Sequence, residues 1–346
     1  HHHRAHCDST SQRQGQRHLH DPVPDPVPAP EPVLNPALLN WQEAPVKTLW
    51  EARDSHGAVV YDNKIWVMGG LNANGQVSAP GVVNYDKAKY FSDVWSSTDV
   101  INWQLVLSSA PWGKRRSLQV VDFKGKMWLI GGWVSSQGNK NDVWSSRDGV
   151  NWTQEIASAA FPAREGHQVA VFQNRIWLIG GVSYEKNLLF NDVWYSEDGI
   201  DWKQATARAD FSPRWDDSVT VFKNKLWLIG GMIFGGRFYK DVWSSDDGVK
   251  WAQVAARPPF DARQGDSAIE YKGKLWVIGK LDAEINGGVN DVWYSDDGVS
   301  WQKTQNNPKW TGREDFGAVK FQDKIWILGG MDKNWTWKND IWFSGF

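Results

Sequence analysis

The stretch "RIWLIGGVSYEKNLLFNDVWYSEDGIDW", residues 175–202, carries three tryptophans in three different contexts. The first lies in an apolar run that ends in Gly-Gly, the second follows Asp-Val, and the third follows a Ser-x-Asp-Gly turn. Each context recurs along the chain at intervals near 50 residues. The apolar run holds Trp66, Trp128, Trp177, Trp227, Trp276 and Trp326; the second context holds Trp95, Trp144, Trp194, Trp243, Trp293 and Trp342; the third holds Trp103, Trp152, Trp202, Trp251 and Trp301.

This period, with short strands and Gly-Gly marks, predicts an all-β propeller of six units. Each unit reads as four antiparallel strands, called a to d. In the third unit they are expected at 167–172, 176–181, 192–196 and 201–205. Strand b is almost wholly apolar, as a strand covered on both faces should be.

The third set of tryptophans has one member fewer than the others. The last unit stops after strand c, at "NDIWFSGF", residues 339–346. The missing strand d is predicted in "LNWQEA", residues 39–44, because Trp41 precedes Arg53 by the same 12 residues that separate Trp202 from Arg214. The N-terminal strand should therefore complete the last blade and hide the sheet edges, which makes residues 37–346 a closed six-bladed propeller.

Residues 1–36 differ in composition from the rest. They are polar and His-rich, and then have proline at almost every second position, which favours an extended spacer. Two interpretations stay open: a flexible tail, or a segment that docks on a neighbouring subunit and mediates self-association. With the aromatic-rich propeller, the spacer favours an extracellular or cell-surface location, with any signal peptide outside the printed sequence.

Bulk composition excludes several function classes. The formal net charge of -2 gives no support for a nucleic-acid partner. No apolar run approaches the roughly 18 residues of a transmembrane helix. Cys7 is the single cysteine, so neither an intramolecular disulfide nor a Cys-based metal site is expected, and no cofactor is predicted.

The stretch "PAREGHQVAVFQNRIWLIGG", residues 162–181, resembles a kelch repeat: a Pro-x-Arg-x-Gly-His start, a strand, then apolar residues and Gly-Gly. The resemblance covers all six units, and Gly-Gly fails only at Gly279-Lys280. The turn from Ser196 to Trp202 resembles the Asp-box of sialidases, one residue shorter. That resemblance implies a structural turn whose Ser and Asp side chains bind its own backbone amides. Eighteen of the 25 tryptophans, the three sets with Trp41, are then expected to fill the space between blades.

Ligand sites are expected on the face that carries the d–a and b–c connections, because the other face has only tight, uniform turns. Thirteen residues before each strand-b tryptophan stands an arginine: Arg53, Arg115, Arg164, Arg214, Arg263 and Arg313. They should ring the mouth of the central channel. Either each arginine forks onto an acid or loop carbonyls and pins one blade to the next, or the ring is a polar funnel for a carboxylate- or hydroxyl-rich ligand.

The residues after these arginines break the symmetry of the repeat. Seven positive charges, the arginines and Arg116, stand against seven negative ones in these segments: Asp54, Glu165, Asp216, Asp217, Asp266, Glu314 and Asp315. Histidine occupies the third position in two units, at His56 and His167, and acids occupy it in two others. With Trp215, this mixture suits sugar binding.

The b–c loops supply aromatic residues outside the periodic sets. The first unit has an insertion, residues 71–92, and two other loops span 231–240 and 331–339. Exposed aromatics on a loop rim are a binding signal. The candidates are Phe234, Phe238, Tyr239, Trp335 and Trp337.

Catalytic templates are missing from the sequence. There is no Gly-rich phosphate loop, His-Glu-x-x-His or Gly-x-Ser-x-Gly motif, and no catalytic or metal-binding residue is assigned. Galactose oxidase, a related propeller, needs a Cys–Tyr copper centre that Cys7 cannot supply. The N-acetylneuraminate epimerase (mutarotase) family has the same kelch propeller and is the best enzyme analogy, although fold is a poor guide to function.

Three functions follow. The first is a non-enzymatic propeller that binds a protein or glycan through its loop face. The second is a sugar mutarotase- or epimerase-like enzyme that uses rim Arg, His and carboxylate groups. The third is a structural subunit assembled through residues 1–36.

Overall fold

The computed structural model describes residues 22–28, 34–47, 49–261, 268–279, 281–282, 287–288 and 290–346. The chain divides into two compact units, His1–Leu34 and Asn35–Phe346. In the first unit, residues 22–28 are exposed and without regular structure. The second unit is built of strands, with two short 3-10 turns, η1 (Pro36–Leu38) and η2 (Tyr85–Lys87). Within the described ranges, no helix is long and apolar enough to cross a membrane.

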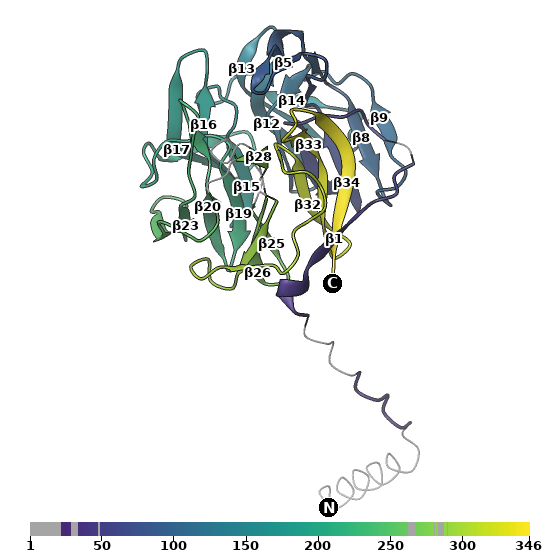
Figure 1. The fold of residues 1–346 in the computed structure, drawn as a ribbon. Coiled ribbons are helices and arrows are strands. Elements are labelled where there is room, and N and C mark those ends of the chain that lie inside the picture. Colours follow the sequence, from purple (N-terminus) through teal and green to yellow (C-terminus); the bar gives the residue numbers. More distant parts are fainter. Residues whose placement is uncertain are drawn as a thin grey trace, which may run out of the picture. The chain divides into compact units, whose positions relative to one another are not determined.

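Six antiparallel sheets form the second unit, as predicted (Figure 1). Blades one and two contain β2 (Gly57–Tyr61), β3 (Lys64–Met68), β8 (Val94–Ser97) and β9 (Gln104–Leu107), then β11 (Gln119–Phe123), β12 (Lys126–Val134), β13 (Gly138–Ser146) and β14 (Thr153–Ile156). Blades three and four contain β15 (Gln168–Phe172), β16 (Arg175–Ser183), β17 (Leu188–Ser196) and β18 (Trp202–Thr206), then β19 (Ser218–Phe222), β20 (Lys225–Ile229), β23 (Val242–Ser245) and β24 (Ala252–Ala255).

Blade five contains β25 (Ala268–Tyr271), β26 (Lys274–Ile278), β29 (Val292–Ser295) and β30 (Gln302–Lys303), and blade six contains β32 (Gly317–Phe321), β33 (Lys324–Asp332), β34 (Trp337–Gly345) and β1 (Asn40–Glu43). The first strands of successive blades are neighbours, and β2 also contacts β32. The ring is therefore closed.

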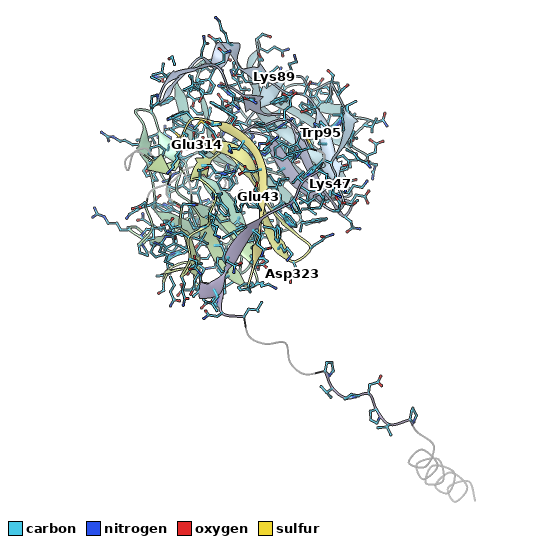
Figure 2. The ribbon with its side chains drawn as sticks, turned by 45° about the vertical axis from the view of Figure 1, so that its right-hand side comes forward. Glu43, Lys47, Lys89, Trp95, Glu314 and Asp323 are labelled. Carbon is cyan, nitrogen blue, oxygen red and sulfur yellow. The ribbon has the colours of Figure 1, made fainter. Side chains whose placement is uncertain are left out.

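Closure uses the N-terminal strand, which confirms the prediction from Trp41. Strand β1 pairs antiparallel with β34, with Trp41 opposite Ser344 and Glu43 opposite Trp342. Figure 2 shows Glu43 beside the yellow C-terminal strand. Trp41 packs edge-on against Trp310 at 4.8 Å between ring centroids. The two ends of the propeller sequence thus share one sheet.

The repeated turn between the tryptophans exists for packing. Gly199, in the c–d turn of blade three, has φ +84°, and a Cβ there would lie 2.5 Å from the ring of Trp128 in blade two. The same relation joins Gly149 to Trp66 and Gly248 to Trp177. Glycine is needed because it adopts this backbone conformation and leaves room for the neighbouring ring.

Each turn is also held by its own side chains, as the Asp-box resemblance implies. The Gly199 amide donates to Ser196 Oγ at 2.8 Å, and the amides of Ile200 and Asp201 donate to Asp198 Oδ1 at 2.9 and 2.8 Å. These backbone donors, the Asp201 amide foremost, lower the pKa of Asp198. The turn is self-contained, so it is a structural unit.

The b–c connections form small hairpins of their own. The insertion of blade one folds into β4 (Leu71–Asn72) with β7 (Lys89–Tyr90), and β5 (Val77–Ala79) with β6 (Val82–Val83). Further pairs are β21 (Met232–Ile233) with β22 (Arg237–Phe238), and β27 (Leu281–Asp282) with β28 (Gly287–Gly288). Two short strands in the d–a connections, β10 (Arg115–Arg116) and β31 (Arg313–Glu314), extend blades two and six.

Candidate functional site

The repeated arginines are internal braces. Arg164 is fully buried, and its Nη1 and Nη2 lie 2.6 and 2.8 Å from the two carboxylate oxygens of Asp192. Its Nη1 also donates to the carbonyl of Gly180 at 2.9 Å. Asp192 belongs to the Asp-Val-Trp motif, and Trp194 Nε1 donates to the same carboxylate. Equivalent buried arginines form the pairs Arg53–Asp93, Arg115–Asp142, Arg214–Asp241 and Arg313–Asp340.

The main chain of four of these arginines, Arg53, Arg115, Arg164 and Arg214, binds the preceding blade. The Arg164 amide donates to the carbonyl of Lys140, and its carbonyl accepts from the Gly132 amide, both at 3.1 Å. The side chain holds its own blade, so the arginine joins two blades, as the first of the two interpretations states. The five described arginines are therefore not available as ligand contacts, which corrects the polar-funnel prediction for them. Arg263 lies outside the described residues.

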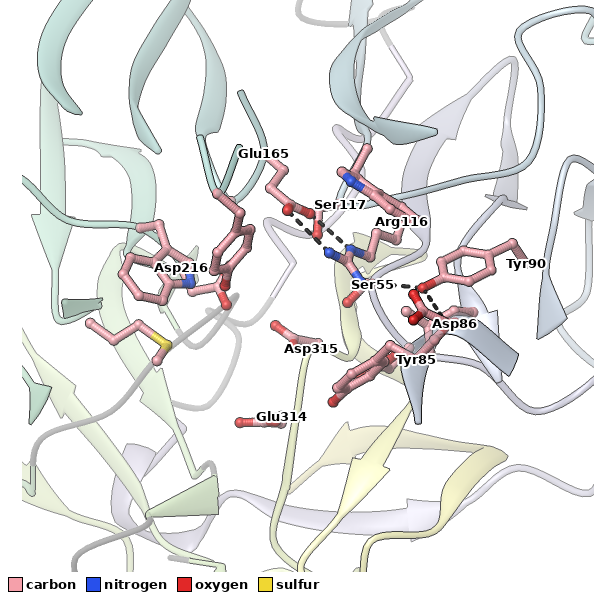
Figure 3. Close-up of a pocket in the computed structure, with 17 residues that line it drawn as sticks. Ser55, Tyr85, Asp86, Tyr90, Arg116, Ser117, Glu165, Asp216, Glu314 and Asp315 are labelled. Atoms are coloured by element: carbon pink, nitrogen blue, oxygen red, sulfur yellow. Dashed lines mark hydrogen bonds and ion pairs between the residues drawn. The ribbon is translucent and has the colours of Figure 1, made fainter. Parts of the chain in front are cut away.

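A cavity of about 450 Å³ opens on the predicted face (Figure 3). Its lining comes from two kinds of connection that the repeat leaves variable. The d–a connections supply Asp54, Ser55, Arg116, Ser117, Glu165, Gly166, Trp215, Asp216, Glu314 and Asp315. The b–c connections supply Leu71, Tyr85, Asp86, Tyr90, Trp133, Tyr184 and Met232.

The described lining is acidic. The repeated arginines are neutralised by the aspartates of strand c and do not balance the acids of the rim. Among the described lining residues Arg116 is the one base, while the acids are Asp54, Asp86, Glu165, Asp216, Glu314 and Asp315. The sequence predicts equal numbers of positive and negative charges, and the described lining of this cavity does not have them.

Arg116 is held on one wall of the cavity (Figure 3). Its Nε and Nη2 lie 2.9 and 3.2 Å from the two oxygens of Glu165, and its Nη1 donates to Tyr90 Oη at 3.2 Å. The guanidinium also lies 4.3 Å from the ring centroid of Trp133. The pair bridges blades two and three, so the single described base of the lining is already matched by a carboxylate.

Asp54 is a buried carboxyl of the site with a strongly perturbed pKa. It is buried, and its Oδ1 accepts from Trp337 Nε1 at 2.8 Å. Burial, and then the nearby carboxyls of Asp315 and Glu314, raise the pKa of Asp54 well above its ordinary value. Negative charge is therefore crowded at this wall, and the protonated form of Asp54 is favoured.

The floor of the cavity is a ring of residues two positions after the braces. The Ser55 amide donates to the carbonyl of Asp315, the Ser117 amide to that of Ser55, and the Asp216 amide to that of Gly166. All five have a positive φ between 51° and 66°. Four are not glycine, and this left-handed conformation is costly for them, so the ring is a strained element that the surrounding blades hold in place.

The predicted histidines lie below this floor. His56 lines the channel beneath it, and His167 Nε2 lies 2.9 Å from the carbonyl of Ile130. Burial, then the charge of Arg53, lowers the pKa of His56 to about 3. Burial, then Arg164, lowers the pKa of His167 to about 3. Both are neutral packing residues.

One further predicted residue at this position, Asp217, does not reach the cavity. Asp217 is fully buried and is not among the lining residues. Asp266 lies outside the described residues. Three of the predicted residues that stand three positions after an arginine are described: His56, His167 and Asp217. None of them contacts the cavity.

The predicted aromatic residues lie beside the cavity, on β22, over the guanidinium of Arg214 and in the last b–c loop. Trp215 lines the cavity, with its ring centroid 5.2 Å from that of Phe234 and 5.8 Å from that of Tyr184. Phe234 and Tyr184 are 38% and 47% exposed, so they form an aromatic edge beside the opening. Phe238 is half-buried on β22. Tyr239 is half-buried over the guanidinium of Arg214 at 4.0 Å and supports the brace.

The prediction that the last b–c loop, residues 331–339, exposes its tryptophans is wrong. Trp337 is 2% exposed and belongs to a buried cluster with Leu71 and Tyr90. Its backbone amide and carbonyl bind the side chain of Asn74 from the blade-one insertion. Trp335 is half-buried and packs against the same cluster.

Four aromatic lining residues, Tyr85, Tyr90, Trp133 and Tyr184, are absent from the predicted set. The available signal was their position in b–c loops outside the periodic sets, the property that identified Phe234. Within the described residues, no group of three or more His, Cys, Asp and Glu side chains could hold a metal ion.

Comparisons with known proteins agree with this architecture. A family model described as the KLHDC2/KLHL20/DRC7 Kelch-repeats domain matches residues 32–231, more than half of the chain. A solved structure titled "Structure of YjhT" is similar with a TM-score of 0.69 and 14% sequence identity, covering 86% of this chain and 96% of that chain. At that identity the likeness shows the fold alone. No curated protein sequence matches the chain.

Proposed function

We propose that this chain, which belongs to the family described as the KLHDC2/KLHL20/DRC7 Kelch-repeats domain, is a non-enzymatic binding propeller. Its partner, a protein or a glycan, binds in the cavity on the loop face. Kelch propellers commonly bind proteins, and the variable connections of this chain converge on that cavity.

One observation carries the proposal: the residues of the repeat and the residues of the cavity are different sets. The Arg and Asp side chains that recur in the repeat pair with each other, and the recurring Trp side chains pack between the blades. The cavity is lined by the positions that change from blade to blade, such as Asp54, Arg116, Glu165, Trp215 and Glu314. Variation on a rigid scaffold at a concave surface is the usual arrangement of a recognition site.

The test is a binding screen with the full chain against a peptide library and a glycan array. A ligand found in either should lose affinity by degrees in Trp215→Ala and Asp86→Asn, which change the lining. Asp122→Asn is the matched control, because Asp122 is exposed near the end of β11, beside the a–b turn on the other face. Equal losses in all three variants would reject the cavity as the binding site.

A second candidate is a sugar mutarotase- or epimerase-like enzyme. The observation that favours it is the raised pKa of Asp54, which lies near Asp315 and Glu314, since a carboxyl that stays protonated can act as a general acid. The buried arginines and neutral histidines are poor candidates, so this work would fall to the carboxyls. Asp54→Asn should then abolish turnover of the sugar outright, whereas a binder would only lose affinity.

Residues 1–36 support a third proposal, a structural subunit that self-associates through this Pro-rich segment. Removing residues 1–34 should then convert an assembled form into a monomer, as measured by light scattering. A full chain that is already monomeric would reject it. An extracellular or cell-surface location is likewise proposed from this segment and the aromatic-rich propeller, and cell fractionation of the native protein tests it.

A further inference from the structure

The insertion of blade one, residues 71–92, holds one wall of the cavity in two ways. Its first residue, Leu71, pairs with Asp54 through two main-chain hydrogen bonds of 3.0 Å. Three residues later, Asn74 binds the backbone of Trp337, whose indole donates to the Asp54 carboxyl. We propose, building on the binding function above, that Asn74 is a positioning residue of the cavity, which fixes the Asp54 side chain through Trp337.

Asn74 binds Trp337 in the way that a paired strand would. Its Nδ2 donates to the Trp337 carbonyl at 3.1 Å, and its Oδ1 accepts from the Trp337 amide at 2.9 Å. A side-chain amide carries a donor and an acceptor, so it satisfies both main-chain groups of one residue. Asn74 is anchored in turn, because its own amide donates to Asn72 Oδ1 at 2.8 Å. The clasp, defined here as Asn74 with Trp337, therefore joins the insertion to blade six.

The clasp holds the ring of Trp337 as well as its backbone. The residue is 2% exposed, and its ring packs in a buried cluster with Leu71 and Ala73 of the insertion. Its Nε1 donates to Asp54 Oδ1 at 2.8 Å. Because the same insertion carries Asn74, loss of the clasp should displace the indole from the carboxyl.

The Asp54 carboxyl depends on this indole. Asp54 lines the cavity although the residue is only 5% exposed, and a buried polar group keeps one orientation when it has a hydrogen-bond partner. Burial, and then the carboxyls of Asp315 and Glu314, raise the pKa of Asp54. The Trp337 bond and the charge of Arg116 lower it. Weakening the Trp337 bond should therefore raise that pKa further.

This wall distinguishes blade one from the other units. The strand-b tryptophans on either side of the insertion are 62 residues apart, whereas the others follow at 49 or 50. The insertion also supplies Tyr85, Asp86 and Tyr90 to the lining. A ligand that touches these side chains and Asp54 contacts one connected segment, so the clasp affects the affinity of the cavity.

The test follows the Asp54 carboxyl by NMR in the full chain, labelled with carbon-13 at the aspartate carboxyls. Asp54→Asn identifies its signal, and a pH titration gives its midpoint. The midpoint should be higher in Asn74→Ala than in the parent chain, because the Trp337 bond is weakened. Asn84→Ala is the matched control, since Asn84 is an exposed asparagine of the same insertion whose side chain makes no capping hydrogen bond. An equal midpoint in Asn74→Ala and the parent chain overturns the inference.

A double variant shows whether Asn74 acts through Trp337. Trp337→Phe keeps the backbone groups that Asn74 binds and removes the indole donor. It should raise the midpoint by itself, and adding Asn74→Ala should raise it no further. Shifts that add would show that Asn74 acts by another route, which also overturns the inference. Circular dichroism checks that each variant folds, and the comparison of Asn74→Ala with Asn84→Ala stands even where Trp337→Phe does not fold.

Affinity connects the clasp to the binding function. A ligand from the peptide or glycan screen should bind Asn74→Ala about three- to tenfold more weakly than Asn84→Ala, as expected for one misplaced hydrogen bond. Equal affinities would overturn the role of the clasp in binding. A screen that returns no ligand rejects the binding function, while the carboxyl titration still decides whether Asn74 positions Asp54.

Discussion

Arg164 and Asp192 form a buried, bidentate ion pair in which two nitrogens and two oxygens meet at 2.6 and 2.8 Å. The arginine comes from the entry to strand a and the aspartate from strand c, so one pair ties three strands of a blade through the Gly180 carbonyl. Its recurrence in the described blades explains why arginine and the Asp-Val-Trp motif share the same period.

Removing one partner of this pair should be strongly destabilising. Asp192→Asn leaves a buried guanidinium without its counter-charge, which we expect to cost about 3–5 kcal/mol of unfolding free energy. Urea denaturation followed by tryptophan fluorescence measures it. The control is Glu197→Gln in the exposed pair with Arg175, where a change of at most about 1 kcal/mol is expected. Similar costs at both sites would contradict the role of the brace.

Gly199 should not tolerate a side chain. Gly199→Ala places a Cβ 2.5 Å from the Trp128 ring at φ +84°, so overpacking adds to backbone strain, and together they should cost about 2–5 kcal/mol. Gly273→Ala is the matched control, because φ is +74° but nothing lies within 4 Å. The control should lose only about 1–2 kcal/mol. If the two variants unfold at the same urea concentration, the contact with Trp128 is not the reason for glycine.

Closure of the ring predicts a sharp boundary for truncation. Removing residues 1–34 leaves β1 intact and should keep the melting temperature of the propeller. Removing residues 1–44 strips β1 from β34, exposes Trp310, and should lower the melting temperature or prevent folding. A propeller that melts unchanged without residues 1–44 would show that β1 is dispensable.

Acid should destabilise the fold through the buried histidines. Their folded pKa of about 3 lies below the ordinary value, so the unfolded chain binds protons first as pH falls below about 6.5. Stability is fully present above that pH and is lost towards pH 3. Each histidine contributes a slope of up to about 1.4 kcal/mol per pH unit in that window.

The variant His167→Gln isolates one of these slopes. Its side-chain amide can still donate to the Ile130 carbonyl, and it does not titrate. The unfolding free energy of this variant should depend less steeply on pH between about 4 and 6.5 than that of the parent chain. An identical pH profile would mean that His167 has the same pKa in the folded and unfolded chain, and would contradict the lowered pKa of the buried ring.

Local spacing explains how much of the fold the sequence predicts. The separation of Trp41 from Arg53 matches that of Trp202 from Arg214, so closure could be read from the chain alone. The Arg164–Asp192 pair also left a periodic trace, because an aspartate stands two residues before every strand-c tryptophan. The spacing alone does not show that these two residues pair, and the prediction that the rim acids balance the arginines is wrong, because the strand-c aspartates do so.

The exposure of side chains in the loops could not be predicted from the sequence, because it depends on contacts with segments that are distant in the chain. Trp337 is covered by Asn74 and Leu71 of the blade-one insertion, and no local sequence pattern predicts this contact. The acidity of the cavity follows in the same way, since it depends on where the arginine side chains turn. Phe234, in contrast, lies at a hairpin tip, and its exposure follows from the loop alone.

The location of binding is tested most directly by hydrogen–deuterium exchange of the full chain with and without a ligand selected from the peptide or glycan libraries. Protection is predicted in the connections that line the cavity, residues 54–55, 85–90, 116–117, 165–166 and 215–216. Protection confined to the tight turns of the other face, such as residues 173–175 and 196–201, would place the partner elsewhere and contradict the account.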